Sequence, residues 1–190
     1  FMFLQIHTFA TTTNKRMRNI LIIGAGRSAS SLIKYLLEKS TQENLHLTIG
    51  DLSLELAQRK TNNHPNATPI ALDINNVEQR QSEIQKADIV ISMLPAHMHI
   101  DVAKDCVTFK KNMVTASYVS DAMQSLDSEV KANGLIFMNE IGLDPGIDHM
   151  SAMKVIHEIE EKGGKMILFE SFCGGLVAPE SDTNLWNYKF

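Results

Sequence analysis

The feature that most restricts the fold of this chain is an apolar run that ends at a glycine-rich turn. Residues 19–23 read Asn-Ile-Leu-Ile-Ile, and residues 24–29 read Gly-Ala-Gly-Arg-Ser-Ala. A continuous apolar run of this length is typical of a strand buried on both faces of a parallel sheet. From Ser28 onward, leucine and isoleucine recur at helical spacing. The pattern predicts a strand, a tight turn and a helix, the unit that holds a diphosphate in dinucleotide-binding domains.

Each small residue of the turn has a specific role in such a unit. Gly24 would permit the tight turn, Gly26 would let the diphosphate approach the backbone, and Ala29 would let the helix pack on the sheet. Arg27 and Ser28 lie between them at the mouth of the helix, so all five are candidates for cofactor binding. A motif this short is weak evidence alone, but its place between a strand and a helix strengthens it.

Apolar runs and amphipathic segments continue to alternate as far as Met138. Further strands are predicted over residues 45–49, 67–72, 88–94, 112–116 and 135–138. Helices are predicted from Ser28 to a polar break at 40–44, and over residues 54–62, 77–85, 98–109 and 120–133. Because each helix would return the chain to the same edge of the sheet, the strands should be parallel. We therefore predict an α/β fold, a doubly wound parallel sheet (Rossmann) with strand order 3-2-1-4-5-6.

The remaining segments suggest a leader and a second, incomplete domain. We expect a disordered or non-native leader over 1–16, with Met17 as the true start, and a dinucleotide-binding domain over 17–147. The alternative, a targeting segment, is less favoured because no positive region precedes the apolar one. Residues 148–162 predict an amphipathic helix and 166–173 another strand. Residues 148–190 would be the beginning of a truncated α+β substrate domain.

Composition excludes several classes of partner. The formal net charge is −4, and no block of like charges is present, which argues against nucleic acid as a ligand. The two cysteines, Cys106 and Cys173, lack the spacing of a metal site and do not suggest a disulfide framework. No apolar run approaches the roughly 18 to 20 residues of a membrane-spanning helix. We therefore expect a soluble cytoplasmic protein without a metal, whose partners are small molecules.

Acidic residues follow the second and third predicted strands. Asp51 ends the second strand, where a carboxylate can accept hydrogen bonds from the ribose hydroxyls and would repel the extra phosphate of NADP. NAD is therefore favoured, with NADP as the alternative, since neither Arg27 nor Arg59 is an obvious phosphate ligand. Asp73 and Ile74 would lie beside the adenine. The competing interpretations are a solvated turn residue for Asp51 and a helix N-cap for Asp73.

Polar groups also follow the other three strands. The strand ends carry Leu94 and Pro95, residues 115–118, and the loop 139–146. All should project into the crevice at the carboxyl edge of the sheet, where nicotinamide and substrate would meet. Leu94, Ala116 and Ser117 are accordingly further candidates for cofactor binding.

Four longer runs carry a resemblance to a known family. Residues 88–95 (DIVISMLP), 112–118 (NMVTASY), 139–149 (NEIGLDPGIDH) and 171–180 (SFCGGLVAPE) resemble the saccharopine dehydrogenase family, and the likeness spans 18–190. The resemblance implies an oxidoreductase of lysine metabolism that interconverts saccharopine with glutamate and aminoadipate semialdehyde, moving hydride to or from a nicotinamide cofactor. A homodimer is one arrangement that the full-length protein could adopt.

The resemblance also implies roles for residues. Ser117 and Tyr118 would contact saccharopine, Asp144 would lie between substrate and cofactor, and Leu143, Asp144 and Pro145 would line the nicotinamide ribose. The turn at Cys173 and Gly174 should let the backbone approach the substrate closely. In the family, the basic side chains that hold the substrate carboxylates lie beyond Phe190. We therefore expect weak or moderate dinucleotide binding and negligible turnover.

The general base is left open by the sequence. Asp144 could accept the proton if its neighbours raise its pKa, or it could cap the helix that follows Pro145. His97, His99 and His149 are other candidate bases, although a histidine at such a position is more often a bystander. Two functional alternatives also stay open. One is a polyamine enzyme similar to carboxynorspermidine dehydrogenase, and the other is a dinucleotide-binding module without catalytic activity.

Overall fold

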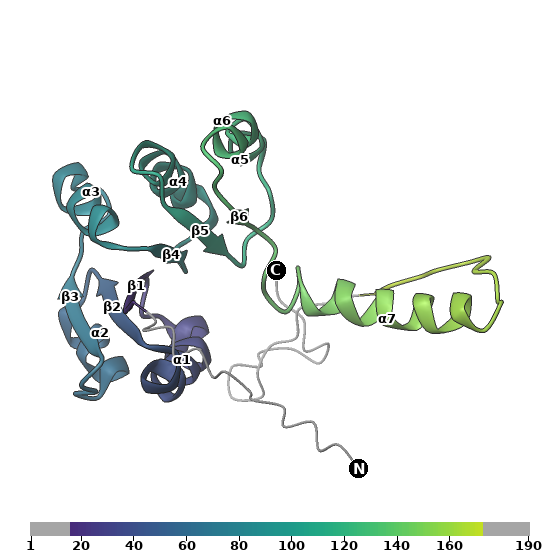
Figure 1. Ribbon diagram of the computed structural model, residues 1–190, viewed down its shortest axis with the longest axis horizontal. Coiled ribbons are helices and arrows are strands. Elements are labelled where there is room, and N and C mark those ends of the chain that lie inside the picture. Colours follow the sequence, from purple (N-terminus) through teal and green to yellow (C-terminus); the bar gives the residue numbers. More distant parts are fainter. Residues whose placement is uncertain (1–15, 173–190) are drawn as a thin grey trace, which may run out of the picture. The chain divides into compact units, whose positions relative to one another are not determined.

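A six-stranded parallel sheet forms the centre of the chain. The computed structural model describes residues 16–172, and the sheet order is β3-β2-β1-β4-β5-β6, as Figure 1 shows. The strands are β1 (Arg18–Ile23), β2 (Leu45–Asp51), β3 (Ala67–Ala71), β4 (Ile89–Ser92), β5 (Asn112–Thr115) and β6 (Phe137–Met138). All five neighbouring pairs are parallel. The predicted fold class and strand order are both confirmed.

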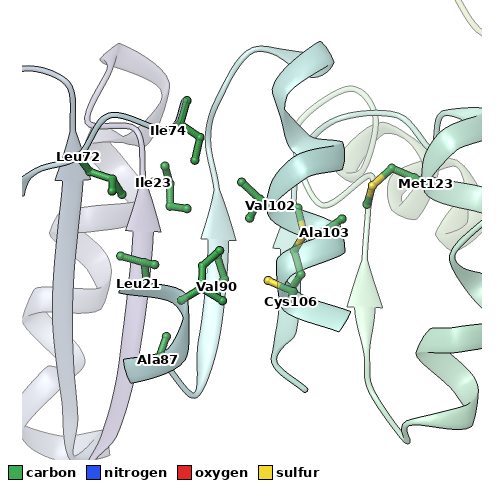
Figure 2. Close-up of a cluster of buried hydrophobic side chains, with 12 residues drawn as sticks. Leu21, Ile23, Leu72, Ile74, Ala87, Val90, Val102, Ala103, Cys106 and Met123 are labelled. Atoms are coloured by element: carbon green, nitrogen blue, oxygen red, sulfur yellow. The ribbon is translucent and has the colours of Figure 1, made fainter. Parts of the chain in front are cut away.

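Both faces of the sheet are buried, and the residues of β1 show this most directly. Ile20 and Ile22 belong to one buried cluster, together with side chains of α1 (Ser30–Glu43) and α2 (Leu54–Thr61). Leu21 and Ile23 belong to a second buried cluster, together with side chains of α3 (Val77–Lys86), α4 (His99–Thr108) and α5 (Asp121–Gln124). Figure 2 shows the buried side chains of this second cluster. Alternate side chains of a strand face opposite sides. The unbroken apolar run therefore reflects two cores, one on each side of β1.

The helices begin where short polar side chains satisfy their first amide groups. Ser53, Asn76 and Ser120 precede α2, α3 and α5, and each accepts a hydrogen bond from a backbone N–H inside the helix. Short 3-10 turns, η1 (Arg27–Ala29) and η2 (Ala96–Met98), lead into α1 and α4. These N-cap hydrogen bonds and 3-10 turns fix the loops at the carboxyl edge of the sheet. Most of the candidate residues lie in those loops.

Two predicted helices differ from the structure. The predicted helix at 120–133 is divided into α5 and α6 (Asp127–Ala132), because the backbone tightens to an i→i−3 hydrogen bond at Leu126, whose N–H donates to the carbonyl of Met123. By contrast, α1 continues through most of the expected polar break to Glu43. Ser40 is buried there and donates a hydrogen bond to the carbonyl of Leu37, so its polarity does not end the helix.

The last predicted strand is not formed in the described part of the chain. Residues 166–172 pair with no other strand among residues 16–172. A strand requires a hydrogen-bonding neighbour, and Ile167 and Phe172 are almost fully exposed, so neither pairing nor burial supports a strand there. The prediction was wrong for these residues, and Cys173 lies outside the described residues.

The chain separates into two compact units, with the boundary between His149 and Met150. The first contains the sheet and helices α1 to α6. The second contains most of α7 (Ile147–Glu161), whose side chains are all at least partly exposed. Residues 1–15 of the expected leader lie outside the described residues. No described helix is both long and apolar enough to cross a membrane.

Candidate functional site

The two glycines of the first turn are required for different reasons. Gly24 has a φ of +105°, and a Cβ added to it would lie 2.8 Å from the carbonyl oxygen of Met93. Its N–H donates to the carbonyl of Gly50 at 2.7 Å, which holds the turn against β2. Gly26 has an ordinary φ of −63°, and an added Cβ would meet nothing within 4 Å. Of these two positions, the fold itself requires glycine only at Gly24, and the open space over Gly26 fits the approach of a diphosphate.

The turn opens into the N-terminus of the first helix. Ala29 is buried against the sheet, whereas Arg27 and Ser28 are exposed at the mouth. The helix α1 that follows has 14 residues, so its first amides and its dipole favour an anion at this end. The placement of these three residues suits the cofactor role that the sequence suggested.

Asp51 makes a contact that sequence reasoning missed. One of its carboxylate oxygens, Oδ2, accepts a hydrogen bond from the N–H of Ala25 at 2.7 Å, and Oδ1 accepts one from the N–H of Ser53 at 2.9 Å. The carboxylate therefore joins the glycine turn to the start of α2. Only the second contact could have been found from sequence, since an aspartate side chain commonly accepts a hydrogen bond from the backbone N–H two residues later. Each oxygen keeps a second lone pair that a ribose hydroxyl could use.

A cavity of about 220 Å³ adjoins Asp51 at the carboxyl ends of β1, β2 and β3. It brings together candidates from four separate segments: Gly24, Asp51, Asp73, Ile74 and Leu94. Asp73 is not the N-cap of α3, because that position belongs to Asn76, whose side chain accepts the N–H of Gln79. Instead, Asp73 accepts the N–H of Asn75 and shapes the loop that lines the cavity. The N-cap alternative for Asp73 was wrong.

A larger cavity, of about 470 Å³, lies at the ends of β4 and β5. Predicted residues that line it come from distant parts of the chain: Ser28, Leu94, Ala116, Ser117, Tyr118, Asp144 and Pro145. Tyr118 donates its hydroxyl hydrogen to Oδ1 of Asp144 at 2.9 Å, so these two candidates form a pair. Leu143 is strongly exposed and does not line this cavity. Leu94 borders both cavities.

The three candidate histidines have different environments. His99 is buried and lines the larger cavity, and its pKa is lowered by burial and, to a smaller extent, by the nearby charge of His97. His149 is exposed and contacts Oδ1 of Asp148 at 2.8 Å, a hydrogen bond that raises the pKa of His149. His97 is also exposed and does not line the cavity. Of the three, His99 alone lines it.

The described cysteine is not part of the site. Cys106 is buried in the core cluster that contains Val90 and Met113. Burial, with a further contribution from the charge of Asp105, raises the pKa of its thiol to about 12. A thiol of this kind is unreactive. Cys173 and Gly174 lie outside the described residues, and no cluster that could hold a metal ion occurs among residues 16–172.

Comparisons with known proteins identify the family. Residues 20–138 match the family model for the saccharopine dehydrogenase NADP binding domain, and residues 142–190 match the saccharopine dehydrogenase C-terminal domain. The chain belongs to the saccharopine dehydrogenase family. The resemblance found in the sequence is thus confirmed, and the match supports the Rossmann-like fold that the alternation of strands and helices predicted.

Relatives of this saccharopine dehydrogenase family member are longer than the chain itself. The chain is 42% identical to the NADP(+), L-glutamate-forming saccharopine dehydrogenase of Pyricularia oryzae, over 91% of the chain and 38% of that protein. It is 36% identical to the mitochondrial alpha-aminoadipic semialdehyde synthase of Mus musculus, over 98% of the chain and 19% of that protein. The solved structure of apo saccharopine dehydrogenase (L-Glu forming) from Saccharomyces cerevisiae matches with a TM-score of 0.77 and 37% identity, covering 91% of this chain and 38% of that one.

Proposed function

We propose that this chain binds a nicotinamide dinucleotide across its glycine turn and forms the cofactor-binding part of an oxidoreductase that interconverts saccharopine with glutamate and aminoadipate semialdehyde. One observation carries the proposal: the glycine turn and both cavities lie at the carboxyl edge of the sheet. There the order of the strands reverses, because β2 and β3 lie on one side of β1 and β4, β5 and β6 lie on the other. Ligands of open α/β sheets bind at this point. The names of the relatives supply the substrate class.

The residues divide naturally between the two ends of such a cofactor. Gly24, Asp51 and Asp73 line the smaller cavity, which we assign to the adenosine end. Ser117 and Tyr118 line the larger cavity, which we assign to the nicotinamide and the substrate. We place the boundary of the dinucleotide-binding domain at residue 147, and we retain a cytoplasmic location and a homodimeric full-length protein as predictions.

The chemistry assigns a role to Asp144. When bound, the cofactor supplies the hydride acceptor, and loss of hydride leaves the substrate as an iminium that water must attack. A side chain must then take a proton from that water. Asp144 lines the cavity and accepts a hydrogen bond from Tyr118, which holds its carboxylate in place. We propose Asp144 as the proton acceptor and Tyr118 as the residue that orients it.

We expect the 190-residue chain alone to turn over saccharopine negligibly. Saccharopine carries three carboxylates, which require cationic partners, yet no lysine or arginine is among the described residues that line the larger cavity. The chain spans 38% of the fungal relatives' length. The measurement is the absorbance of reduced cofactor after mixing the chain with NAD and saccharopine. Steady turnover would show that the cavity is sufficient without those partners.

The matching family model and the fungal relatives name NADP, whereas the acidic Asp51 favours NAD, and we propose that this chain binds NAD more tightly than NADP. If Asp51 binds the adenosine ribose as we propose, its carboxylate would repel an added 2′-phosphate. The next residue, Leu52, is apolar and largely exposed, and it lines the same cavity. Leu52→Arg should therefore raise the affinity for NADP about tenfold, since a charge-assisted hydrogen bond contributes about 1.5–3 kcal/mol, and should change NAD binding little. Calorimetric titration of the unmodified chain and of the Leu52→Arg variant with NAD and with NADP measures the ratio of the two affinities.

Asp51→Asn provides the matched test of the charge. Asparagine keeps one oxygen that can accept a hydrogen bond from the N–H of Ala25, but it removes the negative charge. The ratio of NAD affinity to NADP affinity should therefore fall. Asp51→Ala would also lower this ratio, but would release the glycine turn and weaken both cofactors. Tighter binding of NADP than NAD by the unmodified chain would overturn the assignment.

A further inference from the structure

His99 lies beneath the larger cavity, between the ends of two neighbouring strands. It is the first residue of α4 and is almost completely buried. Its Nδ1 lies 2.8 Å from Oγ of Ser92, at the end of β4, and its Nε2 lies 2.7 Å from Oγ of Ser117, just beyond β5. The hydroxyl of Thr115 is also near Nε2, at 3.3 Å. The imidazole thus joins hydroxyl groups from both strands.

The surroundings of His99 do not suit a general base. Burial lowers its pKa, so the imidazole is harder to protonate and is a weaker proton acceptor. A neutral imidazole offers one donor and one acceptor, and here both nitrogens face hydroxyl groups. The geometry suits a residue that holds its neighbours in place.

Ser117 is the most accessible of the three hydroxyl residues around His99. All three of these hydroxyl residues border the cavity, but Ser92 and Thr115 are fully buried, whereas Ser117 is partly exposed. A serine hydroxyl rotates freely unless a fixed partner selects its orientation. We propose that His99 is a positioning residue that orients the Ser117 hydroxyl toward the nicotinamide end of the cavity. This inference rests on the proposed function, because that function supplies the ligand for Ser117.

Two amide variants of His99 separate the hydrogen bond to Ser92 from the hydrogen bond to Ser117. The side-chain amide of glutamine reaches about as far from the backbone as Nε2 of histidine, and that of asparagine about as far as Nδ1. His99→Gln should therefore keep the bond to Ser117 and lose the one to Ser92. His99→Asn should do the reverse. A purely structural role would make the two variants similar, or would rank them by stability alone.

The binding experiment compares NAD with ADP-ribose, which lacks the nicotinamide. We expect His99→Asn to weaken NAD about fivefold, the effect of one net hydrogen bond, and His99→Gln to weaken it less than about twofold. ADP-ribose should bind all forms alike. In a Ser117→Ala background, His99→Asn should cause no further loss, because the hydroxyl on which it acts is gone. An equal loss with both variants, a parallel loss of ADP-ribose, or an undiminished effect without Ser117 would overturn the proposal.

An NMR measurement tests the contact between His99 and Ser117 without any cofactor, so it separates failure of this inference from failure of the proposed function. In the ¹⁵N spectrum of the histidine side chains, Ser117→Ala should shift the Nε2 resonance of His99, and Ser92→Ala should shift Nδ1. If the unmodified chain bound neither NAD nor ADP-ribose, the proposed function would fall, and these shifts would still decide whether His99 holds Ser117. An Nε2 resonance unmoved by Ser117→Ala would overturn the pairing itself. Circular dichroism and urea denaturation establish that each variant is folded.

Discussion

Gly26→Ala is expected to reduce the affinity for NAD about 100-fold while leaving the fold intact, an effect at the upper end of the 1–3 kcal/mol that overpacking costs. The added methyl group would meet no protein atom within 4 Å, but it would occupy the space that a diphosphate needs. The backbone of Gly26 is one that alanine adopts easily. The free energy of unfolding should therefore stay unchanged or rise by up to about 1 kcal/mol, because alanine restricts the unfolded chain.

Gly24→Ala is the matched control, with the opposite expectation for stability. Its Cβ would collide with a backbone oxygen, and its φ of +105° is strained for any L side chain. We expect a loss of about 2–4 kcal/mol in the free energy of unfolding, together with loss of binding. Calorimetry with NAD and urea denaturation of both variants give the comparison. Normal NAD binding by Gly26→Ala, or an equal loss of stability in Gly26→Ala and Gly24→Ala, would contradict the proposal that this turn binds the diphosphate.

The parts of the fold that the sequence predicts well are those encoded by local patterns. The run at 19–23 is apolar at every position after Asn19 because β1 is buried on both faces, and the same reasoning located the other strands. The order of the sheet followed from the helices between the strands, since these connections leave few alternatives. The grouping of candidates at the carboxyl edge followed in turn. Gly24 and Asp51 were thus predicted to bind the same cofactor, and both line the smaller cavity.

What the sequence did not predict depends on contacts between distant residues. Tyr118 and Asp144 were both candidates, but their hydrogen bond depends on how the loop after β6 returns to β5. Asp51 was expected to face the ribose only, and its bond to Ala25 joins two strand ends. His99 looked like a bystander because the three hydroxyls around it come from two strands. Residues 166–172 have strand-like composition, but whether they pair depends on a neighbouring strand.

Asp105→Ala is expected to lower the free energy of unfolding by about 3–5 kcal/mol, the cost of leaving a buried charge without its partner. Asp105 on α4 accepts a hydrogen bond from Nε of Arg80 on α3 at 2.6 Å, and both side chains are about nine-tenths buried. Gln81 donates to the other oxygen of Asp105 at 2.8 Å. Urea denaturation followed by circular dichroism measures the loss.

Two further variants test whether burial causes this effect. Asp127→Ala removes the partner of Lys131 in an exposed ion pair of α6, and should cost less than about 0.5 kcal/mol. Replacing both Arg80 and Asp105 with apolar residues of similar volume should recover much of the loss, since no unpaired charge is left. A cost for Asp105→Ala as small as that for Asp127→Ala would show that Arg80 finds other partners or water.

The same ion pair should also affect the smaller cavity, which we assign to the adenosine end of the cofactor. Arg80 donates from Nη1 to the carbonyl of Ile74 at 2.6 Å, and Ile74 lines the smaller cavity. Asp105 holds the guanidinium that in turn holds this loop, although Asp105 itself does not line the cavity. In conditions where Asp105→Ala stays folded, we expect its affinity for ADP to fall about fivefold, comparable to the loss of one net hydrogen bond. Unchanged ADP affinity in the folded variant would mean that the loop at Ile74 keeps its shape without the ion pair, and that the pair acts on stability alone.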